Sequence, residues 1–351
     1  MYVNQPMHSA SRAAQASARA AAAALDGSRR IVRGRRAAGG MAALAPRWGV
    51  GAAPDAEGVS PLLVGLLDGL LARYWERSPT AAAAMAFLER RQDAPILFDH
   101  FAFRSFGVDG CGIEALAKPL LDLGYSRRDR LDFKAKKLTA VWFSAPIPEL
   151  PRVFVSELRV DELSPQAQDV VRRYTRIAAP AASGGHMMLS GVVGTLPWPR
   201  PLRSDFDLLA AESEYAAWTL VNGCALNHTT VSVHNLSGSL ASIDALTGAL
   251  ADEGFALNAS GGIVKRSPDG LLLQASTVAD RVPHAFPPPR DAGTTEAASE
   301  LVPGAYIEFA ERAVLPSFAH LAATDVRECH RRDGFEAGNA DKIFESTTLA
   351  S

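Results

Sequence analysis

The sequence predicts an α+β protein in which two β-α-β-β-β modules form a curved mixed sheet around a cavity, with added helices. One order of strand-like and helix-like segments occurs twice, at about residues 94–160 and again at 223–312. A mainly helical connector over residues 161–222 separates the two copies. The copies share no obvious sequence identity, so the prediction rests on the order of their elements.

Composition excludes several classes of protein. The chain has 351 residues, of which 48% are hydrophobic and 21% are charged, so it can bury a sizeable core and is not disordered. No uninterrupted apolar run has membrane-spanning length. The net charge of −2 gives no footprint for nucleic acid, and the three cysteines form no CxxC pair. A soluble intracellular globular protein with reduced cysteines is expected.

Residues 1–57 differ in composition from the rest of the chain. They contain eight arginines, no lysine and three acids, a net charge of +5, which leaves −7 for the remaining residues. Without an apolar h-region this segment is not a secretory signal, and its Ala/Ser/Arg-rich composition is typical of an organelle transit peptide. Arg12 and Arg19 lie two turns apart on a possible helix, a feature typical of mitochondrial leaders, so the mitochondrion is the alternative to the plastid. A disordered tail or a misassigned start is the alternative.

A folded catalytic domain is expected over residues 58–351. Ser60-Pro61 predicts a helix start, with a capping hydroxyl followed by proline at the first helical position. Leucines at helical spacing follow as far as Ser78-Pro79, where a second, alanine-rich helix begins.

Each module starts with a strand and continues with a helix. In module one the predicted elements are a buried strand over 96–106, a helix over 111–123 and strands over 138–144 and 153–160. The connector is expected to hold helices over 162–177 and 205–221 with a Gly/Pro-rich piece between them. Module two has a strand over 225–234, a helix over 239–253, a hairpin from 262–266 and 271–277, a Pro-rich loop over 283–289 and a strand over 304–311, followed by a C-terminal tail over 313–351.

Three ionisable residues lie inside these mostly apolar strands, where charge is costly unless it is bound. His100 and His228 occupy matching positions in the first strands of the two modules, and Glu308 lies in the last strand of module two. Two imidazoles and a carboxylate form the facial triad of non-haem Fe(II) oxygenases, which leaves open positions for substrate and O₂. The same set could hold Zn²⁺, Mn²⁺ or Co²⁺. For each residue, a hydrogen-bonded core position is the alternative.

Two further charged residues are candidates for the same cavity. Arg104 follows His100 by four residues, so both side chains lie on one strand face about 13 Å apart. A guanidinium there suits bidentate capture of a substrate carboxylate, and a structural ion pair is the alternative. Glu157 in module one matches Glu308 by symmetry and is a candidate fourth ligand. A structural carboxylate paired with Arg104 or Arg159 explains Glu157 equally well.

Other histidines and motifs are excluded or left aside. His234 shares a strand with His228, but six residues separate them by roughly 20 Å, so they cannot bind one ion. His186 follows two glycines and is expected in a solvated loop. No Ser-His-Asp order, Walker loop or GxGxxG fingerprint supports a hydrolase, kinase or dinucleotide-binding enzyme.

Several motifs together give the chain a family resemblance from about residue 60 to its C-terminus. They are FDHFAFRSFG, RVFVSEL, NHTTVSVHNL, GAYIEFAER and RRDGFEAGNADKIFEST. The chain resembles the 2-oxoadipate dioxygenase/decarboxylases, and the form of its tail is closest to the plant and algal members. The resemblance implies a fold related to the vicinal-oxygen-chelate proteins, Fe(II) held by His100, His228 and Glu308, and contact of Arg104 with the substrate carboxylate.

The implied reaction converts 2-oxoadipate and O₂ to 2-hydroxyglutarate and CO₂ in lysine breakdown. The expected partners are therefore a 2-oxo acid and O₂, with no nucleic acid and no membrane. The plant-type resemblance favours the plastid stroma as the location. Two alternatives stay open: a glyoxalase-like isomerase or another vicinal-oxygen-chelate enzyme with a different divalent metal, and a non-catalytic plastid protein that influences storage metabolism through partners.

Overall fold

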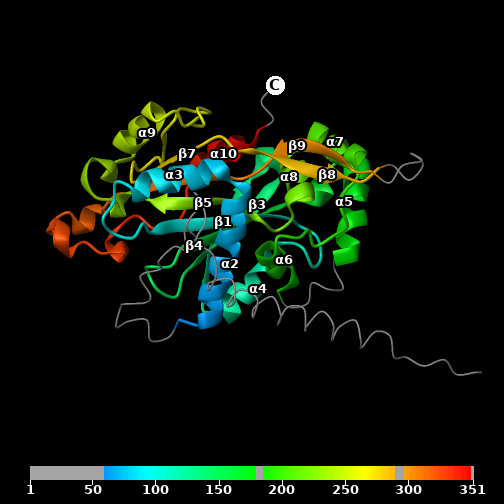
Figure 1. Ribbon diagram of the computed structural model, residues 1–351. Coiled ribbons are helices and arrows are strands. Elements are labelled where there is room, and N and C mark those ends of the chain that lie inside the picture. The colour runs from blue at the N-terminus through cyan, green and yellow to red at the C-terminus, as the bar shows by residue number, and fades with distance from the viewer. Residues whose placement is uncertain (1–58, 179–184, 289–295, 349–351) are drawn as a thin grey trace, which may run out of the picture. The chain divides into compact units, whose positions relative to one another are not determined.

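The computed structural model describes residues 59–178, 185–288 and 296–348, so the predicted leader over 1–57 lies outside the described residues. Its main sheet is built from β1 (Phe98–Phe106), β2 (Ser126–Phe133), β3 (Leu138–Ser144), β4 (Arg152–Leu158), β5 (Leu226–Ser232), β6 (Lys265–Arg266), β7 (Leu272–Ser276) and β10 (Tyr306–Arg312). These strands form one eight-stranded mixed sheet in the order β2-β3-β4-β1-β5-β10-β7-β6 (Figure 1).

The sheet is made of two halves with the same topology. In each half the first strand pairs parallel with the last, β1 with β4 and β5 with β10. On its other side, β4 pairs antiparallel with β3, and β10 pairs antiparallel with β7. The two halves join at the centre of the sheet, where β1 and β5 pair antiparallel. The module helices are α4 (Ile113–Asp122) and α9 (Ile243–Asp252). The predicted α+β fold of two β-α-β-β-β modules is confirmed.

The central pair of strands carries two β-bulges. The register between β1 and β5 shifts by one residue at Asp99 and again at Asn227. Each is therefore the extra residue of a bulge, which locally bends its strand and re-aims the side chains next to it. Each also directly precedes the matching histidine of its module, His100 or His228. The two modules thus repeat the same local distortion at the same position.

Strand register corrects the predicted equivalence of Glu157 with Glu308. β1 pairs His100 with Arg152 on β4, and β5 pairs His228 with Tyr306 on β10. Arg152 and Tyr306 are therefore equivalent. Counting along the two strands from them, the counterpart of Glu308 is Phe154, and the counterpart of Glu157 is Glu311.

Glu157 and Glu311 perform the same structural task. Glu157 Oε2 accepts a 2.7 Å hydrogen bond from the backbone N–H of Ile113, and Glu311 Oε2 accepts one of 2.7 Å from Ile243. Those residues open α4 and α9, whose own N-cap residues make no side-chain cap. At α4 the cap residue is Gly112, where a Cβ would lie 2.5 Å from Glu157 Oε2. The two carboxylates thus cap helices on one face of the sheet, and the side chain of Glu308 lies on the opposite face.

The helices predicted from capping signals begin at the residues that carry those signals. Ser60 caps α2 (Pro61–Arg77), its hydroxyl accepting from the N–H of Leu62, and Pro79 opens α3 (Pro79–Glu89). The connector contains α5 (Pro165–Ala178), α6 (His186–Val193), α7 (Arg203–Glu212) and α8 (Glu214–Asn222). Within the described ranges, none of the helices has the length and apolar character needed to cross a bilayer.

Several elements were not predicted. β2 has the sequence SRRDRLDF and is largely exposed, so it lacks the apolar alternation that marks a strand. The predicted Pro-rich loop begins within a separate hairpin of β8 (Arg281–Phe286) and β9 (Ala298–Pro303). Pro283 is tolerated there because a two-stranded sheet consists of edge strands. His186, expected in a loop, is the first residue of α6.

The C-terminal tail folds back onto the sheet. It contains α10 (Ala337–Ile343) and a 3₁₀ turn over Phe344–Thr347. α10 lies beside β7 (Figure 1). It also contacts β2 and β6, the strands at the two edges of the sheet. The tail thereby covers the sheet face that carries His100 and Glu308.

We predict that Glu157→Ala lowers the free energy of unfolding by about 1 kcal/mol, because α4 loses its only side-chain cap. Glu311→Ala, the matched variant, should lose a similar amount at α9. Urea unfolding of the two variants and the wild type measures this. Cobalt(II) affinity should be unchanged in both, and a loss confined to Glu157→Ala would instead support its role as a fourth metal ligand.

Candidate metal centre

Three neighbouring strands bring the predicted triad together. His100 on β1, His228 on β5 and Glu308 on β10 are each at most 4% exposed. The two Nε2 atoms lie 3.3 Å apart, and Glu308 Oε2 lies 3.1 Å from His228 Nε2 and 3.7 Å from His100 Nε2. Within residues 59–178, 185–288 and 296–348, this is the one group of three His, Cys, Asp or Glu side chains arranged to hold an ion.

The bulged residues orient both imidazoles. His100 Nδ1 lies 2.8 Å from Asp99 Oδ1, and His228 Nδ1 lies 3.0 Å from Asn227 Oδ1. Both oxygens are acceptors, so each Nδ1 carries the proton and donates it. The lone pairs therefore lie on the two Nε2 atoms, which point at one another and at Glu308. Hydrogen bonds of this kind fix the tautomer of metal-binding histidines.

Glu308 is held by a hydrogen bond of its own. Gln274 Nε2 donates to Glu308 Oε1 over 2.6 Å, which leaves Oε2 directed at the histidines. The hydroxyl of Thr230 lies 3.0 Å from His100 Nε2 and is the nearest group that could donate to it. Three acceptor atoms thus converge in a buried space with one neutral hydroxyl among them.

The donor set fits a divalent metal ion. Ligand atoms about 2.1 Å from an ion and roughly at right angles lie about 3 Å apart, close to the separations of these three atoms. Two imidazole nitrogens and one carboxylate oxygen suit first-row divalent metals, and three ligands on one side leave coordination positions open. This buried His-His-Glu group could therefore bind a metal ion.

The charge states agree with this use. Burial lowers the pKa of His228 to about 4, although the Glu308 carboxylate beside it acts in the opposite direction. Burial works to raise the pKa of Glu308, yet His100 and His228 hold it below its ordinary value. Near neutral pH the site therefore has a neutral His228 imidazole and an ionised carboxylate, the forms that bind metals.

The C-terminal tail forms the roof of the site. A small cavity of about 20 Å³ adjoins the triad and is also lined by Gln274, Phe154, Phe335, Ala340, Ile343 and Phe344. The ring of Phe335 meets the His100 ring edge-on at 4.8 Å between centroids, and Tyr306 stacks on His228 at 4.7 Å. A cavity of this volume holds about one water molecule, so the triad is well shielded from solvent.

Arg104 is buried without a carboxylate partner. Its side chain is 2% exposed, and no ion pair involving it is found among the described residues. Its guanidinium lies about 5 to 6 Å from the ring centres of Tyr215, Trp218 and Phe344, and its Nη2 makes a long 3.5 Å contact with the carbonyl oxygen of Phe344. Its Nε has no hydrogen-bond partner in the described part of the chain. Burial lowers its pKa, as expected for a charge removed from water.

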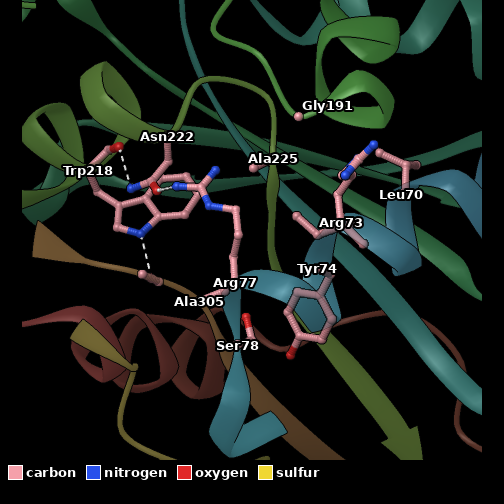
Figure 2. A pocket seen from close by; sticks show the side chains of 13 residues that line it. Leu70, Arg73, Tyr74, Arg77, Ser78, Gly191, Trp218, Asn222, Ala225 and Ala305 are labelled. Carbon is pink, nitrogen blue, oxygen red and sulfur yellow. Dashed lines mark hydrogen bonds between the residues drawn. The ribbon is translucent and has the colours of Figure 1, made fainter. Parts of the chain in front are cut away.

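One pocket is lined by Arg104 and a second lies close to it. One, of about 240 Å³, is lined by Arg104, Tyr215 and Phe344 together with residues 135–137, 212–214 and the end of the tail. Phe344 also lines the cavity at the triad, so this residue lies between the metal centre and the Arg104 pocket. The other pocket holds Arg77, whose Nη2 donates to Asn222 Oδ1 over 2.8 Å (Figure 2). Trp218 lines it, so the indole lies between that pocket and Arg104.

The remaining sequence candidates lie away from the triad. His234 follows β5, and its Nε2 lies 3.2 Å from Glu328 Oε2, so it belongs to a separate polar cluster. His186 is not part of the triad group. Sequence reasoning missed Asp99, Asn227 and Gln274. The first two carried a signal, because a side chain with an acceptor oxygen precedes each of the matching histidines.

We predict that acid destabilises the metal-free protein through His228. Its pKa is about 4 in the folded chain and near 6.5 when unfolded, so between these values only the unfolded chain takes up the proton. The free energy of unfolding should therefore fall as pH falls from 6.5 to 4, by at most about 1.4 kcal/mol per pH unit from this group. Urea titrations at several pH values compare the free energy of unfolding of the wild type with that of His228→Asn. His284, whose pKa is also lowered to about 4, is present in both proteins, so its contribution cancels. Parallel pH curves would contradict the prediction.

The chain is similar to known proteins over most of its length. The sequence model of a family described as HGLS: 2-oxoadipate dioxygenase/decarboxylase matches residues 67–320. A chloroplastic/amyloplastic 2-oxoadipate dioxygenase/decarboxylase of Oryza sativa subsp. japonica is 50% identical over 285 residues, 78% of this chain and 76% of the relative. A chloroplastic one of Arabidopsis thaliana is 48% identical over 285 residues, 78% of this chain and 74% of the relative.

Solved structures agree with the sequence comparison. The crystal structure of the hydroxyglutarate synthase from Oryza sativa in complex with 2-oxoadipate superposes with a TM-score of 0.78 at 45% identity, covering 90% of this chain and 98% of the other. A glyoxalase superfamily protein of Ralstonia eutropha shares the fold at 21% identity, with a TM-score of 0.63, covering 86% of this chain and 100% of the other. This chain belongs to the 2-oxoadipate dioxygenase/decarboxylase family.

Proposed function

We propose that this chain is an Fe(II)-dependent enzyme that converts 2-oxoadipate and O₂ to 2-hydroxyglutarate and CO₂, a step of lysine breakdown. The observation that carries the proposal is the buried convergence of His100, His228 and Glu308 on one sheet face. Family membership supports the reaction, and the rice relative was crystallised with 2-oxoadipate. The sum of the reaction balances, because both atoms of O₂ enter the two products.

The three side chains would hold the iron. Two neutral imidazoles supply lone pairs, and Glu308 supplies one negative charge, so a dication keeps a net positive charge that attracts an anionic 2-oxo acid. When bound, the iron would supply the redox chemistry with O₂ that no amino acid side chain provides. Because the ligands come from adjacent strands, the ion would be open on the side of the tail, where Phe335 and Phe344 line the cavity.

Arg104 would bind the distal carboxylate of the substrate. Its buried guanidinium makes no ion pair within the described residues, although Glu214 in the same pocket attracts it, and its Nε has no hydrogen-bond partner there. Its positive charge also contributes to the low pKa of His228, so it acts on the interior of the same site. A dicarboxylate with one end at the triad and the other at Arg104 would be fixed in direction, because Arg binds carboxylates bidentately.

The tail would exclude water from the reaction. The cavity at the triad is too small for a six-carbon diacid, so Phe344 and the 3₁₀ turn must shift when the substrate enters. The turn is tied to the 3₁₀ turn that follows β2 through the ion pair of Lys136 with Glu345. Closure after binding would keep solvent away while the substrate reacts.

We further propose that residues 58–351 form the catalytic domain and that residues 1–57 direct the protein to the plastid stroma. The composition of the leader and the plastid names of both relatives support this location.

The test uses metal-free protein loaded anaerobically with Fe(II) and then given 2-oxoadipate and O₂. We expect equal amounts of O₂ consumed and of 2-hydroxyglutarate and CO₂ formed, followed by an oxygen electrode and chromatography. His228→Ala should remove turnover, because two ligands bind iron far more weakly than three. Zn²⁺-loaded protein is the control and should consume no O₂. Bound iron without O₂ uptake would contradict the proposal, and isomerisation of a substrate without O₂ would favour a glyoxalase-like enzyme.

A second prediction concerns Arg104→Met, which keeps the side-chain volume but removes the charge. We expect kcat/KM for 2-oxoadipate to fall roughly 10- to 100-fold, because a charge-assisted hydrogen bond is worth about 1.5–3 kcal/mol. The value for 2-oxohexanoate, which lacks the distal carboxylate, should change little. The variant should also be at least as stable as wild type, because a buried unpaired charge has been removed. Equal losses for both substrates would show that Arg104 does not read the distal carboxylate.

A further inference from the structure

Arg312, the last residue of β10, is outside the triad but is bonded to one of its supports. The side chain is 1% exposed. Its Nε donates to Asp99 Oδ2 over 2.6 Å and its Nη2 donates to Asp99 Oδ1 over 2.9 Å, a bidentate pair. Asp99 Oδ1 also accepts the proton of His100 Nδ1. A continuous chain of short hydrogen bonds therefore runs from Arg312 through Asp99 to His100.

The same guanidinium also holds the roof of the site. Its Nη1 donates to the carbonyl oxygens of Arg332 and Gly334, over 3.1 and 2.7 Å. The next residue, Phe335, places its ring over the guanidinium at 5.6 Å and against the imidazole of His100. Arg312 thus fixes both the ring that is to bind the metal and the aromatic side chain that covers it.

The other arginine near Asp99 is placed differently. Arg152 Nη1 lies 3.6 Å from Asp99 Oδ2, beyond a hydrogen bond, while its remaining nitrogens bind Glu328 and Asp333. Without Arg312, Asp99 would keep its negative charge in the core with no partner at hydrogen-bond distance except His100. Such a carboxylate would become hydrated or protonated, and the imidazole of His100 would no longer be held in one orientation.

We propose that Arg312 is a positioning residue of the metal centre, which sets the orientation of His100 through Asp99 and couples it to the C-terminal tail through the backbone at residues 332–334. It does this without touching the ion. The inference rests on the proposed metal centre, but it does not depend on which 2-oxo acid is the substrate. Loss of such supporting contacts typically weakens metal binding 10- to 100-fold.

The test is an anaerobic titration of metal-free protein with Co(II), which reports affinity and the visible absorption of the bound ion. Arg312→Lys keeps the charge but cannot form the bidentate pair and also reach both carbonyls. We expect it to bind Co(II) 10- to 100-fold more weakly than wild type, with a changed absorption spectrum. Arg159→Lys is the matched control, because Arg159 binds Asp132, Glu162 and the carbonyl oxygen of Leu138. It should lose stability without loss of Co(II) affinity.

A double-variant cycle separates positioning from general destabilisation. Asp99→Asn should weaken Co(II) binding, and Arg312→Gln should add less than twofold to that loss if Arg312 acts through Asp99. The Gln variant, which buries no charge, serves as the probe if Arg312→Lys does not fold. Wild-type affinity in both Arg312 variants, with Co(II) binding lost in His100→Ala, would overturn this inference alone. Absence of Co(II) binding by the wild type would overturn the metal centre as well.

Discussion

Much of this structure depends on keeping three hydrogen-bond acceptors close together out of water. Two imidazole lone pairs and a carboxylate converge within 4.8 Å in the middle of an eight-stranded sheet. This arrangement is unfavourable in the apo chain, because each acceptor is desolvated and none can donate to another. The paired strands hold it in place, with the histidines on the two central strands and Glu308 on the strand next to them.

The paired modules explain how the site is both repeated and unsymmetrical. Equivalent bulges at Asp99 and Asn227 orient equivalent histidines, and equivalent carboxylates at Glu157 and Glu311 cap equivalent helices. The symmetry is broken at one position, where module two has Glu308 and module one has Phe154. A fourth protein ligand is therefore absent at the symmetric position, and an apolar wall takes its place beside the cavity. Open coordination positions on that side are what a chelating 2-oxo acid requires.

Buried charge is distributed differently around the two arginines Arg312 and Arg104. Arg312 is fully paired and ties β10, the bulge of β1 and the tail together, so it contributes to the stability of the site. Arg104 makes no ion pair within the described residues and is surrounded by aromatic rings. Under the proposed function, the substrate carboxylate would supply the ion pair that Arg104 does not make in the folded chain. The chain without substrate would then be less stable than one in which Arg104 is paired.

Local signals in the sequence were enough to predict the helix starts at Pro61 and Pro79, because capping depends on neighbouring residues. Periodicity is also a local property, and the repeated order of elements predicted the two-module α+β fold and the matching of His100 with His228. Strands that lack apolar alternation, such as β2, could not be predicted in this way. Only the tertiary structure decided that Glu157 matches Glu311 and caps a helix, since that depends on strand register. It also decided that Arg312 pairs with Asp99, 213 residues away in sequence, because chain folding alone brings such distant charges together.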